Sequence, residues 1–340
     1  RGHEQICYFN DTEAGLKAIV AIHSTILGPS LGGCRMWNYK TEQEALIDVL
    51  RLSRGMTYKA AIAGLGLGGG KSVIIGDPKT DKSEYLFRSF GKFVNGLSGR
   101  YITAEDVGVS PVDMINVKKN TDYVTGIPES MGGSGDPSPM TAYGVYMGIK
   151  ASAKFKWGTD KLKGKTIMIQ GIGKVGENLI MYLQKEEAVL YISDINEDRI
   201  VDVANKYNIK NFHIGKDVYK YDTDIYCPCA LGATLNTHNI KMLECSIVAG
   251  AANNQLEDEK QHSCQLMDKG ILYAPDFLIN SGGLINVYSE IAKYDNNESK
   301  IRTEKIFDTT LKILSQSEEK NISSHEAALY LAEKRILDKK

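Results

Sequence analysis

A glycine motif near the middle of the chain has the spacing that binds a dinucleotide. Gly171, Gly173 and Gly176 form a G-x-G-x-x-G pattern directly after the apolar run 166–169. The first glycine permits a tight strand-to-helix turn, the second lets a pyrophosphate approach the backbone, and the third lets the helix pack close to the strand. The residues expected to bind a cofactor in this loop are Gly171, Ile172, Gly173, Lys174, Val175 and Gly176.

An acidic residue stands where this type of site contacts the ribose. The run 189–193 is typical of a second strand, and Asp194 follows it, about twenty residues after the motif. A carboxylate there bonds the ribose hydroxyls and repels a 2′-phosphate, so NAD is predicted rather than NADP. Arg199 leaves the other choice open, because a nearby arginine can accommodate that phosphate.

Three charged residues in the first part of the chain could carry chemistry. Lys59 precedes the apolar run 60–63, and Lys71 follows three glycines. Asp106 lies in the segment 103–108, directly after the strand-like run 100–102. A buried ammonium needs a partner, whereas an exposed one is an ordinary surface charge. If the two lysines lie together, the pKa of one is depressed toward neutrality, which gives a base, while the other can hold a substrate carboxylate. Residue types alone leave both the surface and the catalytic interpretation open.

Other site types are disfavoured. The segment 64–72 departs from a phosphate loop because Leu65 replaces the required glycine and a strand follows, so ATP binding is not predicted. The six cysteines are too scattered for a disulfide framework. The close pair Cys227 and Cys229 lacks C-x-x-C spacing, so free thiols and no metal site are expected.

Composition restricts the class of protein. The 340 residues suffice for two domains, and a net charge of −1 with 24% charged residues provides no field for nucleic acid or an anionic membrane. A small neutral or zwitterionic partner fits better. No apolar run approaches the roughly 18 residues of a membrane span, and we expect a cytoplasmic protein.

The order of elements predicts an α/β fold. In the first part, 18–22 is strand-like and Thr41 with Glu44 forms a capping box that opens a helix. Glycines and prolines at 126–139 mark a hinge. Strand-like runs then alternate with helical segments at 166–169, 189–193, 224–226, 246–249 and 271–274, which indicates a doubly wound parallel sheet.

The sequence is identified as a member of a known family, the amino acid dehydrogenases of the glutamate/leucine/phenylalanine/valine type, with its leucine-type members most similar. The motifs run in family order across nearly the whole chain. They are Leu31-Gly32-Gly33-Cys34-Arg35-Met36, Leu52-Ser53-Arg54-Gly55-Met56-Thr57-Tyr58-Lys59, Gly68-Gly69-Gly70-Lys71, Thr103-Ala104-Glu105-Asp106-Val107-Gly108, residues 132–144, Cys227-Pro228-Cys229-Ala230-Leu231-Gly232, Gly250-Ala251-Ala252-Asn253-Asn254-Gln255-Leu256 and residues 273–287.

The resemblance implies a domain plan. Residues 1–130 would form a substrate-binding and oligomerisation domain, and residues 131–310 a Rossmann-type NAD-binding domain, with a cleft between them that closes about the hinge. The helices at about 310–340 would pack back on the first domain. The resemblance also suggests an octamer or a smaller homo-oligomer.

The resemblance further implies oxidative deamination of an L-amino acid. Lys59 would bind the α-carboxylate, with Gly32 and Met56 lining that site. Lys71 would be the general acid/base that activates water, and Asp106 would exchange a proton with the amino group. Thr141 and Asn254 would be further cofactor contacts. Asp136 departs from the asparagine usual in leucine-type members.

The resemblance also bears on the substrate. Leu31 and Val287 stand where glutamate enzymes carry the lysine and serine that grip the side-chain carboxylate, so an acidic substrate would meet apolar walls. Ala104 and Leu284 complete a pocket suited to leucine, isoleucine or valine. An aromatic amino acid is the second choice. A non-catalytic NAD-binding sensor is the rival from another class, but it would be expected to lack Lys59, Lys71 or Asp106.

Overall fold

The computed structural model describes residues 2–230 and 232–339, so Leu231 of the motif above lies outside the described residues. The chain forms two compact units, and neither is a continuous stretch of sequence. The first unit comprises Arg1–Asp136, Val287–Tyr294 and Ala332–Lys340. The second comprises Pro137–Asn286 and Asp295–Leu331. The chain passes from the first unit to the second at Asp136, within the segment predicted as a hinge.

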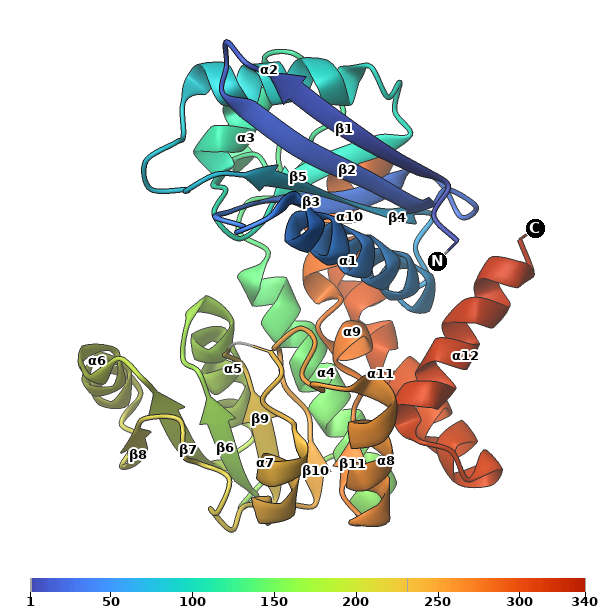
Figure 1. The fold of residues 1–340 in the computed structure, drawn as a ribbon. Helices are drawn as coiled ribbons and strands as arrows, with labels where there is room; N and C mark the ends of the chain where they lie inside the picture. Colours follow the sequence, from blue (N-terminus) through green and yellow to red (C-terminus); the bar gives the residue numbers. More distant parts are fainter. Residues whose placement is uncertain (1, 231, 340) are drawn as a thin grey trace. The chain divides into compact units, whose positions relative to one another are not determined.

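The first unit is built on a mixed sheet in the order β1-β2-β4-β3-β5 (Figure 1). Its strands are β1 (Gln5–Asp11), β2 (Leu16–Ser24), β3 (Ser30–Trp37), β4 (Gly68–Ile75) and β5 (Tyr101–Glu105). Strand β2 is antiparallel to both β1 and β4, whereas β3 is parallel to β4 and β5. Three helices accompany the sheet, α1 (Glu42–Ile62), α2 (Glu84–Asn95) and α3 (Pro111–Lys118).

The two faces of this sheet pack against different helices. Ala45 and Val49 of α1 cluster with Ile19 and Val73 on one face. Side chains of α2 and α3 cluster with the other face, together with Cys34 and Met36 of β3. We call the first of these the α1 face. Figure 1 shows α1 lying along the strands, apart from α2 and α3.

The start of α1 follows from its sequence. The Thr41 hydroxyl accepts a hydrogen bond from the Glu44 backbone N–H at 3.1 Å, as the predicted capping box requires. The reciprocal bond is displaced by one residue, because the Glu44 carboxylate accepts from the Lys40 N–H at 3.0 Å rather than from Thr41. The predicted helix start is confirmed.

The second unit contains a six-stranded parallel sheet in the order β11-β10-β9-β6-β7-β8. The strands are β6 (Thr166–Gln170), β7 (Val189–Asp194), β8 (Asn211–Ile214), β9 (Ile225–Pro228), β10 (Ile247–Val248) and β11 (Leu272–Tyr273). Counted from β6, this is the 3-2-1-4-5-6 order of a doubly wound dinucleotide-binding sheet. The predicted Rossmann-type fold is confirmed.

Helices complete the second unit and link it to the first. They are α4 (Ser138–Trp157), α5 (Lys174–Lys185), α6 (Glu197–Tyr207), α7 (Thr237–Met242), α8 (Glu259–Asp268), α9 (Asp276–Ile279), α10 (Gly282–Ala292), α11 (Asn296–Lys320) and α12 (Ser324–Leu337). The last part of the chain is two helices, because α11 ends at Lys320 and its C-cap residue Asn321 is left-handed, with φ 51°. Both α10 and α12 begin in the second unit and end in the first.

Two further findings concern the whole of the described chain. All six cysteines are free thiols, as predicted. Within the described ranges, no helix combines the length and the apolar character that crossing a membrane would need.

Candidate active site

The period-two alternation of strands places several candidate residues on the α1 face. On β4, Val73 packs in the α1-face cluster, so Lys71 and Gly69, two and four residues before it, point the same way. On β3, Cys34 and Met36 pack on the opposite face, so the alternate side chains of that strand lie on the α1 face.

The same alternation extends to the neighbouring strand β5. Tyr101 belongs to the opposite cluster, which leaves Ala104 on the α1 face. The parallel register pairs Leu31 with Ile102 and Gly33 with Ala104. Leu31 and Ala104 are thus buried neighbours of Lys71 on one side of the sheet, with exposed fractions of 2% and 7%.

Helix α1 approaches the sheet closely at glycines. A Cβ on Gly69 would lie 2.1 Å from the Thr57 backbone nitrogen, so no other residue allows α1 to pack at this distance. This contact brings the turn of α1 that carries Met56 and Lys59 against β4, and both side chains are partly buried. The glycine run was predicted to precede a strand, but its last three members form the first residues of β4.

The pair Gly32 and Gly33 is also required by close contacts. A Cβ on Gly32 would lie 1.8 Å from the Gly70 carbonyl oxygen. A Cβ on Gly33 would lie 2.8 Å from the Asp106 Cβ. Asp106 therefore sits directly over the backbone of β3. From the opposite face, the buried Tyr101 hydroxyl donates to the Gly32 carbonyl at 2.6 Å and holds this strand in place.

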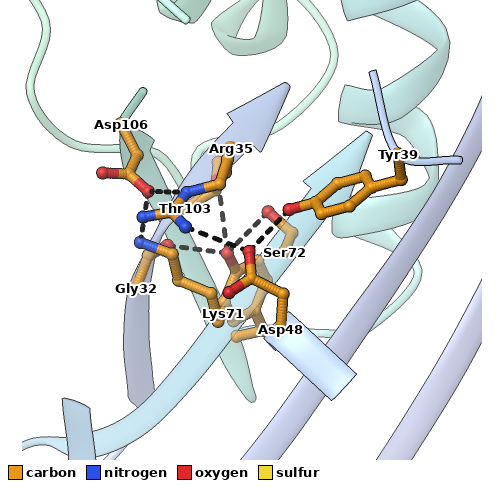
Figure 2. A network of polar contacts seen from close by, with 9 residues as sticks. Gly32, Arg35, Tyr39, Asp48, Lys71, Ser72, Thr103 and Asp106 are labelled. Atoms are coloured by element: carbon orange, nitrogen blue, oxygen red, sulfur yellow. Dashed lines mark hydrogen bonds and ion pairs between the residues drawn. The ribbon is translucent and has the colours of Figure 1, made fainter. Parts of the chain in front are cut away.

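A network of ion pairs joins the candidate residues of the first unit (Figure 2). The Lys71 ammonium lies 2.6 Å from Asp106 Oδ2, and Arg35 Nε donates to the same oxygen at 3.2 Å. Arg35 Nη1 continues to Asp48 Oδ2 at 3.0 Å, which also accepts from the Tyr39 hydroxyl at 2.6 Å. Lys71 is only 6% exposed, so its charge is balanced within the chain.

The network fixes the charge of Asp106. Burial by itself would raise the pKa of this carboxyl, but the Lys71 and Arg35 cations outweigh burial and lower the pKa from 3.8 to about 2. Asp106 is therefore a carboxylate at neutral pH. It can accept a proton or a hydrogen bond from a cationic amine.

Sequence reasoning missed three members of this network, Arg35, Tyr39 and Asp48. Arg35 belongs to the family motif at residues 31–36, but its partner was not predicted. A signal was present, because an arginine in the otherwise buried strand β3 must pair with an acid. The identity of that acid was not readable, since Arg35 and Asp106 are 71 positions apart in the sequence.

The glycine loop of the second unit has the geometry of a nucleotide site. Gly171 has φ 93°, and a Cβ on it would lie 2.6 Å from the Ala230 nitrogen. Helix α5 begins after Gly173 without a side-chain cap, and the N-terminus of a helix directly after a glycine loop is a site that favours an anionic ligand. The Asp194 carboxylate accepts from the Ile172 N–H at 2.9 Å, which fixes the acid beside the loop. These residues fit a dinucleotide.

Arg199 has a structural role beside this loop. Its Nε donates to the Ile172 carbonyl at 3.1 Å, and its Nη2 forms an ion pair with Glu177. Lys206 contacts Glu177 as well, at 2.8 Å. The guanidinium is thus committed to partners within the chain.

The two other predicted cofactor contacts also lie in the second unit. The Thr141 hydroxyl donates to the Pro137 carbonyl at 2.9 Å in the first turn of α4. Asn254 is exposed, with φ 50°, and its carbonyl accepts from the Ala233 N–H at 2.6 Å. Their contacts to a cofactor stay predictions.

Helix α10 carries the remaining pocket candidates. Leu284 lies in its first part and Val287 where the chain returns to the first unit. Further along, the Glu290 carboxylate accepts from the backbone N–H groups of Gly126 at 3.1 Å and Ser134 at 2.7 Å. The predicted hinge segment is therefore tied to α10, a contact that the sequence did not reveal.

Comparisons with known proteins agree with the motifs. The chain matches the dimerisation domain of the Glu/Leu/Phe/Val dehydrogenases over residues 3–123 and the Glutamate/Leucine/Phenylalanine/Valine dehydrogenase domain over residues 132–197 and 192–340. It is 51% identical over 334 residues to leucine dehydrogenase of Bacillus subtilis (strain 168), which covers 98% of this chain and 91% of that protein. For leucine dehydrogenase of Geobacillus stearothermophilus the identity is 49%, over 98% of this chain and 90% of that protein.

A solved structure is similar over the whole chain. The crystal structure of L-tryptophan dehydrogenase from Nostoc punctiforme has a TM-score of 0.87 at 43% identity, covering 99% of this chain and 97% of that one. The fold and the site thus define an oxidoreductase of the amino acid dehydrogenase class. The chain belongs to the glutamate/leucine/phenylalanine/valine dehydrogenase family.

Proposed function

We propose that this enzyme catalyses the reversible, NAD-dependent oxidative deamination of a branched-chain L-amino acid, with leucine preferred and isoleucine and valine accepted. The products are the 2-oxo acid and ammonia. The observation that carries the proposal is the ion pair between buried Lys71 and Asp106, on the sheet face against which the Lys59-bearing helix packs. The identities of 51% and 49% to leucine dehydrogenases, against 43% to a tryptophan dehydrogenase, support the substrate class.

Substrate binding is assigned to the α1 face. Lys59 pairs with the α-carboxylate, and Gly32 and Met56 line that position. Leu31 and Ala104 form apolar walls for the side chain, which disfavours an acidic substrate because its carboxylate would have no partner. Val287 and Leu284 of α10 are assigned to the same pocket.

The chemistry is assigned to Lys71 and Asp106. Asp106, a carboxylate at neutral pH, takes a proton from the substrate ammonium and leaves a neutral amine. Bound NAD supplies a hydride acceptor, and loss of hydride from the α-carbon gives an iminium. Lys71, having lost its ammonium proton to solvent, then removes a proton from the water that attacks the iminium carbon. Asp106 returns its proton to the nitrogen. The carbinolamine hydroxyl loses its proton to solvent as the C–N bond breaks, so that ammonia leaves and the 2-oxo acid forms.

Arg35 has a supporting role in this scheme. It shares Asp106 Oδ2 with Lys71, so the carboxylate keeps a cationic neighbour whenever Lys71 is in its neutral form. Asp48 and Tyr39 orient Arg35 in turn. The acid/base pair is therefore preorganised before substrate arrives.

NAD is proposed over NADP for two reasons. Asp194 is placed beside the loop by the Ile172 N–H, where its charge repels a 2′-phosphate. Arg199, the cation that left NADP open, is paired with Glu177. A phosphate would have to compete with that carboxylate.

The oligomeric state and the cellular compartment are also proposals. The match of residues 3–123 to a dimerisation domain supports a homo-oligomer, and we propose an octamer or a smaller assembly. Small-molecule substrates and the near-neutral charge support a cytoplasmic enzyme with neither nucleic acid nor membrane as partner.

An NADH-formation assay tests the proposal. Leucine, isoleucine, valine, phenylalanine, tryptophan and glutamate are compared by kcat/KM with NAD and with NADP. We expect the branched-chain substrates to lead, with overlap among them, because one methylene is worth only about 1–3 kcal/mol. A higher kcat/KM for phenylalanine or tryptophan would favour the aromatic alternative. NAD binding without turnover of any amino acid would favour a non-catalytic sensor.

A further inference from the structure

The carboxyl end of α1 is held by a guanidinium from the last helix of the chain. Arg335 Nη1 donates to the Ala61 carbonyl at 2.6 Å and, more weakly, to the Ala60 carbonyl at 3.5 Å. Arg335 Nη2 donates to the Leu65 carbonyl at 2.9 Å. Both α1 and this part of α12 belong to the first unit. One side chain thus binds three carbonyls at and just beyond the end of α1.

A second contact joins the same two helices. The Tyr58 hydroxyl donates to the Glu333 carboxylate at 2.8 Å. Glu333 and Arg335 are two residues apart on α12, whereas Tyr58 and Ala61 are three apart on α1. Lys59 lies between these two α1 contacts in the sequence. The last turn of α1 is therefore fixed on both sides of Lys59.

The charge of Arg335 matters as well as its hydrogen bonds. The end of a helix presents unsatisfied carbonyls that carry about half a negative charge. Lys59 is in the last turn of α1, so this negative end reduces the attraction between its ammonium and a substrate carboxylate. A guanidinium on the same carbonyls neutralises that effect. Burial lowers the pKa of Arg335, yet an arginine remains a cation throughout the physiological range.

We propose that Arg335 is a positioning residue for substrate binding: it fixes the last turn of α1 and neutralises its carbonyl end, so that Lys59 is aimed at the α-carboxylate. This role rests on the proposed function only in that Lys59 binds the carboxylate. It adds a residue from the far end of the chain to the substrate site.

The main test compares Arg335→Met with Lys334→Met. Lys334 is the adjacent, exposed cation of the same helix, so its variant controls for charge and for α12 itself. We expect Arg335→Met to raise the KM for leucine about tenfold, the effect of losing a hydrogen-bonded charged group. kcat and the KM for NAD should change by less than about threefold, because Arg335 touches no reacting group. Lys334→Met should match the parent enzyme.

Arg335→Lys is a second, more conservative variant, which keeps the test valid if Arg335→Met is too unstable to fold. A lysine keeps the charge but cannot span three carbonyls, so an intermediate rise in KM is expected, with a smaller fall in Tm than for Arg335→Met. If the KM for leucine in both Arg335 variants equals that of Lys334→Met, the proposal is overturned. For variants of low turnover, the Kd of the 2-oxo acid, measured through bound-NADH fluorescence, replaces KM.

A double-mutant cycle with Lys59→Ala separates this proposal from the proposed function. If Arg335 acts through Lys59, adding Arg335→Met to Lys59→Ala should weaken substrate binding no further. Multiplied effects would mean that Arg335 acts elsewhere, and would overturn the positioning role alone. Unchanged substrate binding in Lys59→Ala itself would overturn the carboxylate assignment, and the positioning role with it.

Discussion

The charged network of the first unit draws Arg35 from β3, Asp48 from α1, Lys71 from β4 and Asp106 from the end of β5. The nucleotide loop of the second unit is instead made by one strand, one turn and one helix, with Asp194 only 22 positions from Ile172. The first site is held by side chains that neutralise one another. The second presents backbone groups, and its helix start has no side-chain cap.

This difference matches the two tasks proposed for the two sites, proton transfer in the first unit and dinucleotide binding in the second. Side chains that move protons must be paired before substrate arrives, because an unpaired buried charge is costly. A loop that binds a dinucleotide needs donors left free for the ligand. Substitutions in the first unit should therefore change chemistry and substrate choice, whereas those in the second should change cofactor affinity.

The largest effect is expected for Lys71→Ala. If Lys71 is the general acid/base, as we propose, its loss should lower kcat by about 10²–10⁴-fold. NAD affinity should stay within about twofold, because Lys71 belongs to the first unit. Steady-state kinetics and NAD titration measure the two quantities, with Lys79→Ala as the exposed control. Activity within about tenfold of the parent would contradict the catalytic role.

Leu31→Lys should break substrate choice next. An ammonium among apolar walls should weaken transition-state binding of leucine by several kcal/mol, which lowers kcat/KM about 10²–10³-fold. NAD binding should persist, and traces of glutamate activity should appear, more so with Val287→Ser added. The measurement pairs kcat/KM with Tm. A large fall in Tm with an unchanged substrate preference would place Leu31 in the hydrophobic core rather than in the pocket.

Acid should weaken the first unit through Asp106. Its pKa is about 2 in the folded chain against the usual 3.8, so its contribution to stability is present above pH 3.8 and is lost as the pH falls toward 2. The shift corresponds to about 2 kcal/mol. Urea unfolding at pH 5 and pH 3 measures the first half of this loss, about 1 kcal/mol. Asp106→Asn should show a correspondingly smaller loss, and an equal loss in both proteins would show that the network does not hold this charge.

The smallest effect is expected for Asp194→Ser, a change beside the nucleotide loop of the second unit. Without the carboxylate, the preference for NAD over NADP should narrow by about tenfold, while kcat with saturating NAD should be nearly retained. Kinetics with both cofactors test this, and Asp198→Ser provides an exposed acidic control. A parent enzyme that already prefers NADP would refute our interpretation of this strand end.

The same contrast explains what the sequence could reveal. The loop at Gly171, the acid at Asp194 and the cap at Thr41 are local, and their residue types and spacing predict their structure. The link between Arg35 and Asp106 depends on strands that are neighbours in the sheet but distant in the chain. No local pattern specifies such a pairing, so the residues that tune Lys71 and Asp106 emerged only from the fold.

The tail shows the same limit. Helices were predicted at about 310–340, but the position of the break at Asn321 depends on a single left-handed residue. The end of α12 belongs to the first unit, where Arg335 contacts α1. The sequence of α12 alone does not predict that contact. Family motifs indicated site residues, and only the structure supplied their partners.

The hold of Arg335 on α1 has a consequence for biosynthesis. Domains generally fold as units as they leave the ribosome, at about 5–20 residues per second. Here the first unit lacks three hydrogen bonds at the end of α1 until the last turns of α12 have been made. At that rate, α1 is synthesised roughly 10–60 s before Arg335. A nascent chain halted before Arg335 would present this helix end to solvent or to a chaperone.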